Sequence, residues 1–141
     1  MTEKPSFRNS VRTQRCLVLA DGFYEWKQEG TAKQPYYIRF KDHRPFVFAG
    51  LWERWEKAEP AIQSCTIITT TPNALMQPLY RRMPVMLHSE ASHVWLDPSL
   101  RDHALLQRFF QPMESDEMEA HPVSPLVNNP RNDTPTCIIP V

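Results

Sequence analysis

The segment from residue 15 to residue 27 constrains the fold of this chain more than any other part of the sequence. Two apolar runs, 16–20 and 23–27, flank the dipeptide Asp21-Gly22, which is typical of a turn. Because side chains alternate between faces along a strand, the second run predicts a strand with Glu25 on the face opposite to Tyr24 and Trp26. The sequence therefore predicts two short strands joined at a sheet rim, with one carboxylate near the start of the second.

The carboxylate of Glu25 lies in an otherwise aromatic and aliphatic run. Aromatic neighbours remove hydration from a carboxylate, which raises its pKa toward the range that is useful for proton transfer. The pattern alone also allows an ordinary exposed Glu on a half-solvated strand, because perturbed carboxylates are a minority. Both interpretations remain open at this point.

The rest of the chain predicts an α+β fold. Aromatic and β-branched residues predict strands at 16–20, 23–27, 36–40, 46–52 and 62–70. Short helices are predicted after Asn73, from Ser89 to Trp95, and from Pro98 to about Phe110. Prolines recur from residue 112 onward, so this part is predicted to be extended or looped, with a last strand at 138–139. We expect a curved, mostly antiparallel sheet with a few short helices.

Length and residue usage limit the class of protein. A chain of 141 residues gives one domain at most. No apolar run approaches the roughly 18 residues of a membrane span, and no signal peptide follows Met1, so no membrane partner is expected. Trp52 and Trp95 lie in apolar runs and are predicted to pack in the core.

The cysteines and histidines do not predict a metal site. Cys16, Cys65 and Cys137 are odd in number and have no C-x-x-C spacing, which argues against both a zinc site and a disulfide framework. Cys16 and Cys65 are predicted to be small buried side chains. No metal and no cofactor are expected, and the cysteine usage fits a reducing, bacterial-type cytoplasm.

The charge distribution is uneven, although the net charge is zero. Lys and Arg outnumber Asp and Glu in residues 1–60, whereas the reverse holds in residues 61–141. Much of the acid lies at 114–119, which is predicted to be a solvated loop or helix end. A modest basic surface on the first part could follow a phosphate backbone, but composition does not establish DNA binding.

Three blocks of sequence occur together: residues 15–27, residues 67–70 followed by 82–87, and residues 121–124 followed by 127–128. In this order they resemble the SRAP family, the SOS response-associated peptidases or abasic-site processing proteins. The resemblance implies a barrel-like core. It covers only the C-terminal part of the family domain, because the family's Asn-Ala-Arg segment would precede Pro5. We therefore expect a single SRAP-like domain over 1–141, truncated at its N-terminus relative to the family.

The resemblance also implies a chemistry. In the family, an N-terminal Cys condenses through its amine and thiol with the aldehyde of an abasic site in single-stranded DNA. The product is a thiazolidine that links protein and DNA covalently. This chain has Thr2 as its second residue and no counterpart of that Cys. The implied partner is single-stranded DNA with abasic sites, but the chain alone is expected not to crosslink to it.

Site residues follow from the same resemblance. Glu25 matches the family's acid, which opens the sugar and moves protons. Tyr80 stands at the position of the family's His, and a phenol with a pKa of about 10 is a poor proton acceptor at neutral pH. Arg82 matches an Arg suited to a phosphate contact. Glu25 and Tyr80 are thus the candidate catalytic residues.

Three further residues have supporting parts in this prediction. Thr69 and Asn73 lie where family residues approach the DNA strand, so with Arg82 they form the candidate DNA-binding set. His121 opens the third block and is predicted to brace the site or the core rather than to react.

Three functional hypotheses follow. The first is an SRAP-family abasic-site processing protein that lacks the crosslinking nucleophile. The second is a non-catalytic single-stranded DNA-binding module, or half of a split protein completed by a separately encoded N-terminal fragment. The third is a peptidase or another hydrolase, as the family's older name suggests, which would need Thr2 as its nucleophile.

Overall fold

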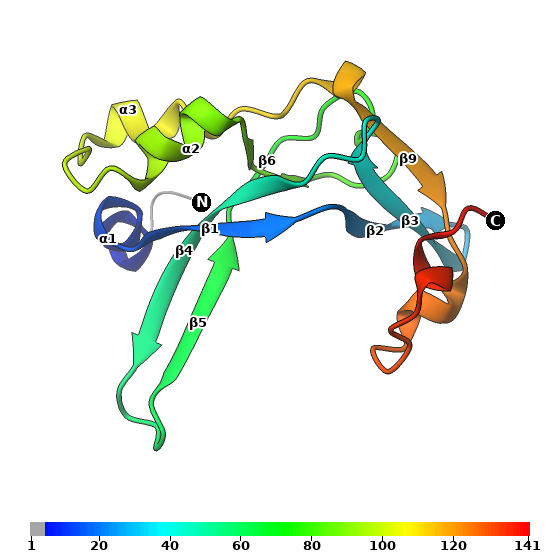
Figure 1. The fold of residues 1–141 in the computed structure, drawn as a ribbon, viewed down its shortest axis with the longest axis horizontal. Coiled ribbons are helices and arrows are strands. Elements are labelled where there is room, and N and C mark those ends of the chain that lie inside the picture. Colours follow the sequence, from blue (N-terminus) through cyan, green and yellow to red (C-terminus); the bar gives the residue numbers. More distant parts are fainter. Residues whose placement is uncertain (1–4) are drawn as a thin grey trace. The chain divides into compact units, whose positions relative to one another are not determined.

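The computed structural model describes residues 5–141, with side chains from Asn9 onward, so Thr2 lies outside the described residues. The chain divides into two compact units (Figure 1). Unit 1 comprises Met1–Leu19, Phe46–Thr70 and Pro84–Met113, and unit 2 comprises Ala20–Pro45, Thr71–Met83 and Glu114–Val141. Antiparallel strand pairs and a few short helices confirm the α+β class. That the chain forms a single SRAP-like domain stays a prediction.

Unit 1 contains most of the helical residues and a sheet of order β1-β4-β5, in which β8 also pairs with β4. The antiparallel hairpin of β4 and β5 runs from the pair Gly50–Ile67 to the pair Trp55–Ile62 and projects well beyond the helices (Figure 1). Every residue of β5 is exposed. The elements are α1 (Pro5–Thr13), β1 (Arg15–Ala20), β4 (Phe46–Trp55), β5 (Ile62–Ile67), β6 (Thr69–Thr70), β8 (Met86–Leu87), α2 (Ser89–Leu96) and α3 (His103–Gln107).

The core of unit 1 forms where the helices cover the start of β4. Trp95 of α2 is fully buried, its ring packs edge-on against Phe109 and Phe110, and its indole Nε1 donates to the Cys16 carbonyl at 3.0 Å. Apolar residues from α1, from α3, and from the strands and the segments beside them complete the cluster: Val11, Ala49, Leu51, Ile68, Val85, Leu87 and Leu106.

Unit 2 is built on an antiparallel sheet of order β2-β3-β9, comprising β2 (Phe23–Glu29), β3 (Ala32–Phe40) and β9 (Met118–Pro122). Gly30 adopts φ 60° in the tight turn between β2 and β3, a conformation that glycine adopts without steric cost. Short 3₁₀ turns flank β9: η1 (Ser115–Glu117), η2 (Pro125–Asn128) and η3 (Pro135–Ile138). The short strand β7 (Met83–Pro84) and the end of β1 fall at the boundary between the units.

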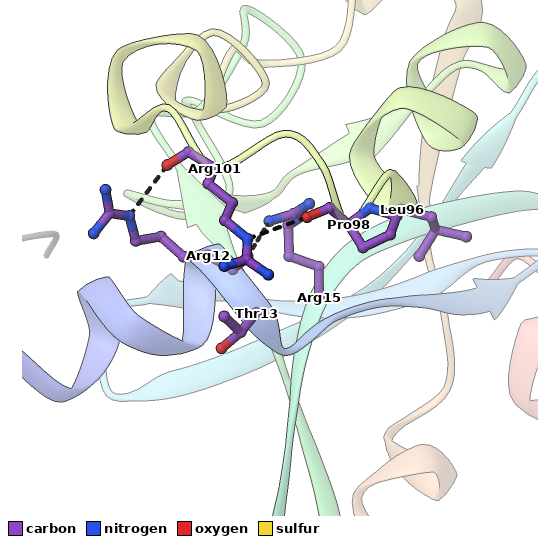
Figure 2. Close-up of a pocket in the computed structure, with 6 residues that line it drawn as sticks. All are labelled: Arg12, Thr13, Arg15, Leu96, Pro98 and Arg101. Carbon is purple, nitrogen blue, oxygen red and sulfur yellow. Dashed lines mark hydrogen bonds between the residues drawn. The ribbon is translucent and has the colours of Figure 1, made fainter.

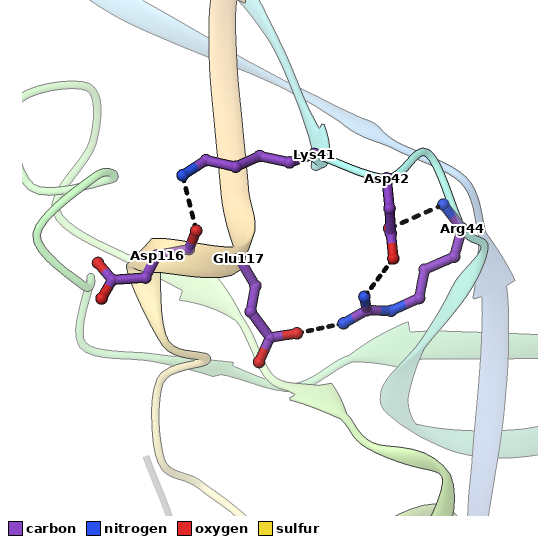
Figure 3. Close-up of polar contacts among 5 residues, drawn as sticks. All are labelled: Lys41, Asp42, Arg44, Asp116 and Glu117. Atoms are coloured by element: carbon purple, nitrogen blue, oxygen red, sulfur yellow. Dashed lines mark hydrogen bonds and ion pairs between the residues drawn. The ribbon is translucent and has the colours of Figure 1, made fainter.

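The turn after β3 is fastened to η1 by polar contacts (Figure 3). Lys41 donates from Nζ to the Asp116 carbonyl at 2.7 Å and from its backbone N–H to the Glu117 carbonyl at 2.9 Å. The Arg44 guanidinium binds the Asp42 carboxylate at 2.5 Å and also the Glu117 carboxylate. Exposed ion pairs stabilise little, so these contacts chiefly fix how β3 and β9 meet at this end of the sheet.

Several sequence expectations about helices are wrong. Residues 74–79 form turns rather than a helix, because Pro78 has no N–H with which to continue the first turn that Asn73 starts. The helix expected from Pro98 begins at His103, where the Asp102 side chain accepts the N–H groups of the first turn. The sequence also indicated Ser89 as the cap of the second helix, but Ser89 is the first helical residue of α2, and His88 occupies the N-cap position.

Other corrections concern strands and burial. Residues 114–119 were predicted to be a solvated loop or helix end; of these, 115–117 form η1, whereas Met118 and Glu119 begin β9. Residues 135–138 form η3 where a strand at 138–139 was expected. The predicted strand 62–70 is interrupted at Ile68. Trp52 and Cys65 are exposed, because the part of the β4–β5 hairpin that carries them projects beyond the core, whereas Trp95 is buried as predicted. Within the described chain, no helix is long and apolar enough to cross a membrane.

Candidate functional site

Glu25 lies in β2 of unit 2, directly opposite Tyr36 of β3. Its side chain is half-buried. Burial raises the pKa of the Glu25 carboxyl above its ordinary value, and a hydrogen bond from the Trp26 backbone, which favours the charged form, offsets only part of that rise. The shift has the direction that the flanking aromatic residues predict. Glu25 can therefore hold and donate a proton nearer to neutral pH than an exposed Glu can.

The register of the sheet separates two faces. Glu25 pairs with Tyr36, which pairs with Pro122, and on the same face Ile38 and Met118 are buried. Because neighbouring residues in a strand point to opposite sides, Tyr24, Tyr37 and His121 belong to the other face. The sequence predicted this separation within β2, but it gave no indication of β9 or of the face to which His121 belongs.

The face opposite Glu25 is aromatic. The rings of Tyr24 and Tyr37 lie 5.3 Å apart between centroids, and those of Tyr37 and His121 lie 5.8 Å apart. Trp26 donates from Nε1 to the Asn128 side-chain oxygen at 2.7 Å. Tyr24 and Trp26 line a groove whose other wall consists of residues between 127 and 138. Sequence reasoning missed this groove; the alternation of Tyr24 and Trp26 was the signal that could have indicated it.

His121 is held by the C-terminal segment. Its Nε2 lies 3.0 Å from the Ile138 carbonyl oxygen, and its ring contacts Tyr37. These contacts tie β9 to η3 on the aromatic face, away from the face that carries Glu25. The predicted bracing role is compatible with them, whereas a direct reaction partnership with Glu25 has no support from the register.

Asn73 anchors the loop that precedes Arg82. Its side-chain oxygen accepts the Met76 backbone N–H at 2.9 Å, and its amide nitrogen lies 3.4 Å from the Met118 sulfur. Met118 pairs with Phe40, four residues along β3 from the position opposite Glu25. At about 3.3 Å per residue, roughly 13 Å of strand separates the two positions. Asn73 thus lies at the other end of this sheet from Glu25.

Tyr80 and Arg82 follow in the same loop of unit 2. Tyr80 is 43% exposed, and among the described residues its hydroxyl has no hydrogen-bond partner. Arg82 is half-buried between the exposed Arg81 and the fully buried Met83. Burial of Met83 orders the backbone directly after Arg82. Tyr80 is thus partly open to solvent, and two arginines, Arg81 and Arg82, follow it directly in the sequence.

Thr69 lies in β6 of unit 1 and is half-buried. The other five predicted site residues, Glu25, Asn73, Tyr80, Arg82 and His121, all belong to unit 2. Unit 2 therefore contains a carboxyl with a raised pKa, an exposed phenol and an arginine. Such a set can donate a proton and contact an anionic strand. Among the described residues, no three His, Cys, Asp or Glu side chains gather as metal ligands would.

Comparison with known proteins identifies the family. The family model for SOS response associated peptidase (SRAP) matches residues 1–130. The chain belongs to the SRAP family. It is 46% identical over 140 residues to the abasic site processing protein YoqW of Bacillus subtilis, and 36% identical over 163 residues to the abasic site processing protein HMCES of Gallus gallus. These alignments cover 98% and 100% of this chain but 62% and 48% of the relatives.

Solved structures show the same fold. A Bacteroides thetaiotaomicron protein superposes with a TM-score of 0.89 at 34% identity, covering 99% of this chain and 62% of that one. A Bordetella bronchiseptica protein gives a TM-score of 0.75 at 25% identity, covering 87% of this chain and 61% of that one. The chain thus spans about three fifths of the bacterial relatives that it matches. The fold agrees with the SRAP expectation.

Proposed function

We propose that this chain is the part of an abasic-site processing protein that binds single-stranded DNA at abasic sites. Membership in the SRAP family supports the class, and the relatives named above are abasic site processing proteins. The observation that carries the proposal is Glu25, a half-buried carboxyl whose pKa is raised by burial. An abasic sugar exists partly as a ring-opened aldehyde, and ring opening needs a group that can exchange protons near neutral pH.

In this proposal, each predicted site residue has a separate role. Glu25 exchanges the proton of the sugar as the ring opens. Tyr80, at the position of the family's His, donates a hydrogen bond to the opened sugar but does not accept a proton. Arg82 contacts a backbone phosphate, and Asn73 together with Thr69 follows the strand. His121 holds the aromatic face in place through Tyr37.

Covalent capture requires a further group. In the family reaction, an α-amine adds to the aldehyde carbon and water leaves as the imine forms. The thiol of the same Cys then adds to the imine carbon, and its proton passes to the nitrogen. Neither Cys16, Cys65 nor Cys137 has an α-amine of its own to offer. The 141-residue polypeptide is therefore proposed to bind without forming the thiazolidine.

A denaturing gel and a binding titration test these points together. The purified chain is incubated with single-stranded DNA that carries one abasic site. No heat-stable shifted band is expected; such a band, lost in Glu25→Ala, would mean that another nucleophile acts.

The binding titration uses fluorescence anisotropy. Arg82→Gln is expected to weaken binding about five- to tenfold and to reduce the slope of log affinity against log salt concentration by about 0.7. The control is Arg131→Gln, which removes one exposed cation from the same unit. Equal effects of the two substitutions would exclude a specific phosphate contact at Arg82.

A second candidate partner is a separately encoded N-terminal fragment. The edge strand β5 is exposed along its whole length, and Leu19 of β1, Trp55 and Ile62 are 77%, 57% and 50% exposed. Exposed apolar edge strands favour pairing with another strand. Co-expression with the first part of a bacterial relative, followed by co-purification, tests this. Failure of the two parts to co-purify, while the chain alone stays folded, would remove the split-protein hypothesis.

A further inference from the structure

Three arginines surround a small cavity in unit 1 (Figure 2). Arg12 projects from the last turn of α1, Arg15 begins β1, and Arg101 lies in the loop between α2 and α3. The remaining lining residues are Thr13, Leu96 and Pro98. None of these residues belongs to the set assigned to abasic-site binding.

Arg15 forms the floor of this cluster and is nearly completely buried, with 9% of its surface exposed. Its guanidinium donates to the carbonyls of Trp95 and Asp97 at the end of α2, both at 2.5 Å. It also donates to the carbonyls of Val11 and Arg12 at the end of α1, at 2.8 and 2.9 Å. Carbonyls at helix C-termini lack intrahelical partners, so Arg15 neutralises the negative ends of two helices.

Arg12 and Arg101 are each oriented by the backbone. Arg12 donates from Nε to the Arg101 carbonyl at 3.1 Å, and Arg101 donates from Nε to the Pro98 carbonyl at 3.4 Å. Tethering at Nε restrains each guanidinium while leaving its terminal nitrogens available. Among the described residues, those terminal nitrogens have no hydrogen-bond acceptor. Within the described chain, the terminal guanidinium N–H groups of Arg12 and Arg101 are therefore available to a ligand in the cavity.

The positive charge of the cluster is not balanced by a carboxylate at ion-pair distance among the described residues. Asp97 acts electrostatically on Arg15, but its carboxylate accepts the Ser99 backbone N–H and hydroxyl at 2.8 and 2.7 Å. Burial lowers the pKa of Arg15; Asp97 acts against this, and the like charge of Arg101 lowers the pKa further. With the Arg15 charge offset by the two helix ends, Arg12 and Arg101 leave the cavity positive, and an anion placed there would relieve the repulsion between the arginines.

We propose that this cavity binds a phosphate group, held by the terminal nitrogens of Arg12 and Arg101 above the buried Arg15. Guanidinium forks match the oxygens of phosphate in geometry and charge. The cavity volume of about 100 Å³ suits one such anion and is well below the size of sites for whole nucleosides. The phosphate belongs either to a nucleic acid backbone or to a free phosphate compound. The site lies in unit 1 and does not depend on Glu25 or Arg82.

The first test is an amide-detected NMR titration of the ¹⁵N-labelled chain with sodium phosphate, against sodium chloride at equal ionic strength. Saturable shifts confined to residues 11–15 and 95–101 are expected. Arg101→Gln is expected to weaken phosphate at least about fivefold, whereas Arg108→Gln is expected to leave it unchanged. Arg108 is an exposed arginine of the same unit outside the cavity, so both substitutions remove one charge. Dispersed spectra of both variants establish that they fold; if Arg101→Gln does not, Arg12→Gln replaces it.

The second arm identifies the source of the phosphate. Fluorescence anisotropy with an unmodified oligothymidylate is measured for the same variants. Weaker DNA binding in Arg101→Gln alone indicates a backbone phosphate, whereas lost phosphate affinity with intact DNA binding indicates a free phosphate compound. Non-saturable phosphate shifts, or equal phosphate affinity in Arg101→Gln and the unsubstituted chain, overturn the proposal. Because Arg82 belongs to unit 2, the Arg82→Gln experiment can fail or succeed independently.

Discussion

Gly22 allows the Tyr37 ring to lie against the start of β2, and replacing it by alanine tests that packing directly. A Cβ at position 22 would lie 2.2 Å from both Cζ and Oη of Tyr37, where ordinary contact begins at 3.4 Å. The ring or the backbone would have to retreat by about 1.2 Å. Tyr37 is only 5% exposed, and the rings of Tyr24 and His121 adjoin it. The ring therefore has little room in which to retreat.

The magnitude follows from two opposing effects. Overpacking of this kind destabilises by about 1–3 kcal/mol. Gly22 has no positive φ, so alanine adds no backbone strain and, by restricting the unfolded chain, returns about 0.4–1 kcal/mol. We expect Gly22→Ala to lower the free energy of unfolding by about 1–2 kcal/mol. At about 4 °C per kcal/mol, the melting temperature falls by about 4–8 °C.

A double-mutant cycle measured by thermal and urea unfolding isolates the contact. Tyr37→Leu removes Cζ and Oη, so in that background Gly22→Ala is expected to be neutral or stabilising. Gly30→Ala is the control: it has open space around its Cβ but φ +60°, so it is expected to destabilise equally in both backgrounds. An equal loss from Gly22→Ala with and without the Tyr37 ring would refute the steric account.

Three further predictions concern buried polar groups. Because the folded-state pKa of Glu25 is raised, its folded form binds a proton more tightly than the unfolded chain. The free energy of unfolding therefore falls as pH rises from about 4.5 through the raised pKa. In thermal unfolding measured between pH 4 and 8, Glu25→Gln should remove this fall in stability. Arg15→Met leaves four helix-end carbonyls without their donor and should lower the free energy of unfolding by about 3–5 kcal/mol, measured by urea unfolding. Arg12→Met should lower it by less than about 1 kcal/mol, and equal losses for the two variants would contradict the assigned hydrogen bonds. Trp95→Phe removes the donor to the Cys16 carbonyl and should destabilise by about 1–3 kcal/mol, and an unchanged midpoint would argue against that bond.

Local patterns predicted the strands near Glu25 well. The alternation in 23–27 is a period-two signal, and the structure confirms β2 with Glu25 opposite Tyr36. The Asp21-Gly22 dipeptide was predicted to form a turn, but the structure has a bend there, between two strands that pair in different sheets. The dipeptide also did not reveal why glycine is needed at position 22. That reason is the close approach of Tyr37, a contact between residues that are distant in sequence. Backbone propensity alone contains no such information.

Other features could not be read from the sequence because they depend on tertiary pairing. Residues 118–122 have a mixed composition with no β-branched or aromatic residue, and they form a strand because β3 offers them a partner. Trp52 lies in an apolar run, yet it is 41% exposed, because it lies in the part of the β4–β5 hairpin that projects beyond the core of unit 1. The arginine cavity was also invisible, since its members come from α1, β1 and the α2–α3 loop.

The most direct test of the central claim is the affinity of the 141-residue chain for single-stranded DNA with one abasic site against the same strand without it. Anisotropy at fixed salt, with equimolar labelled strands, gives both dissociation constants. Our account predicts tighter binding to the abasic strand and loss of that preference in Glu25→Gln, with affinity for the intact strand unchanged. A folded chain that binds the two strands equally, or binds neither, would contradict it.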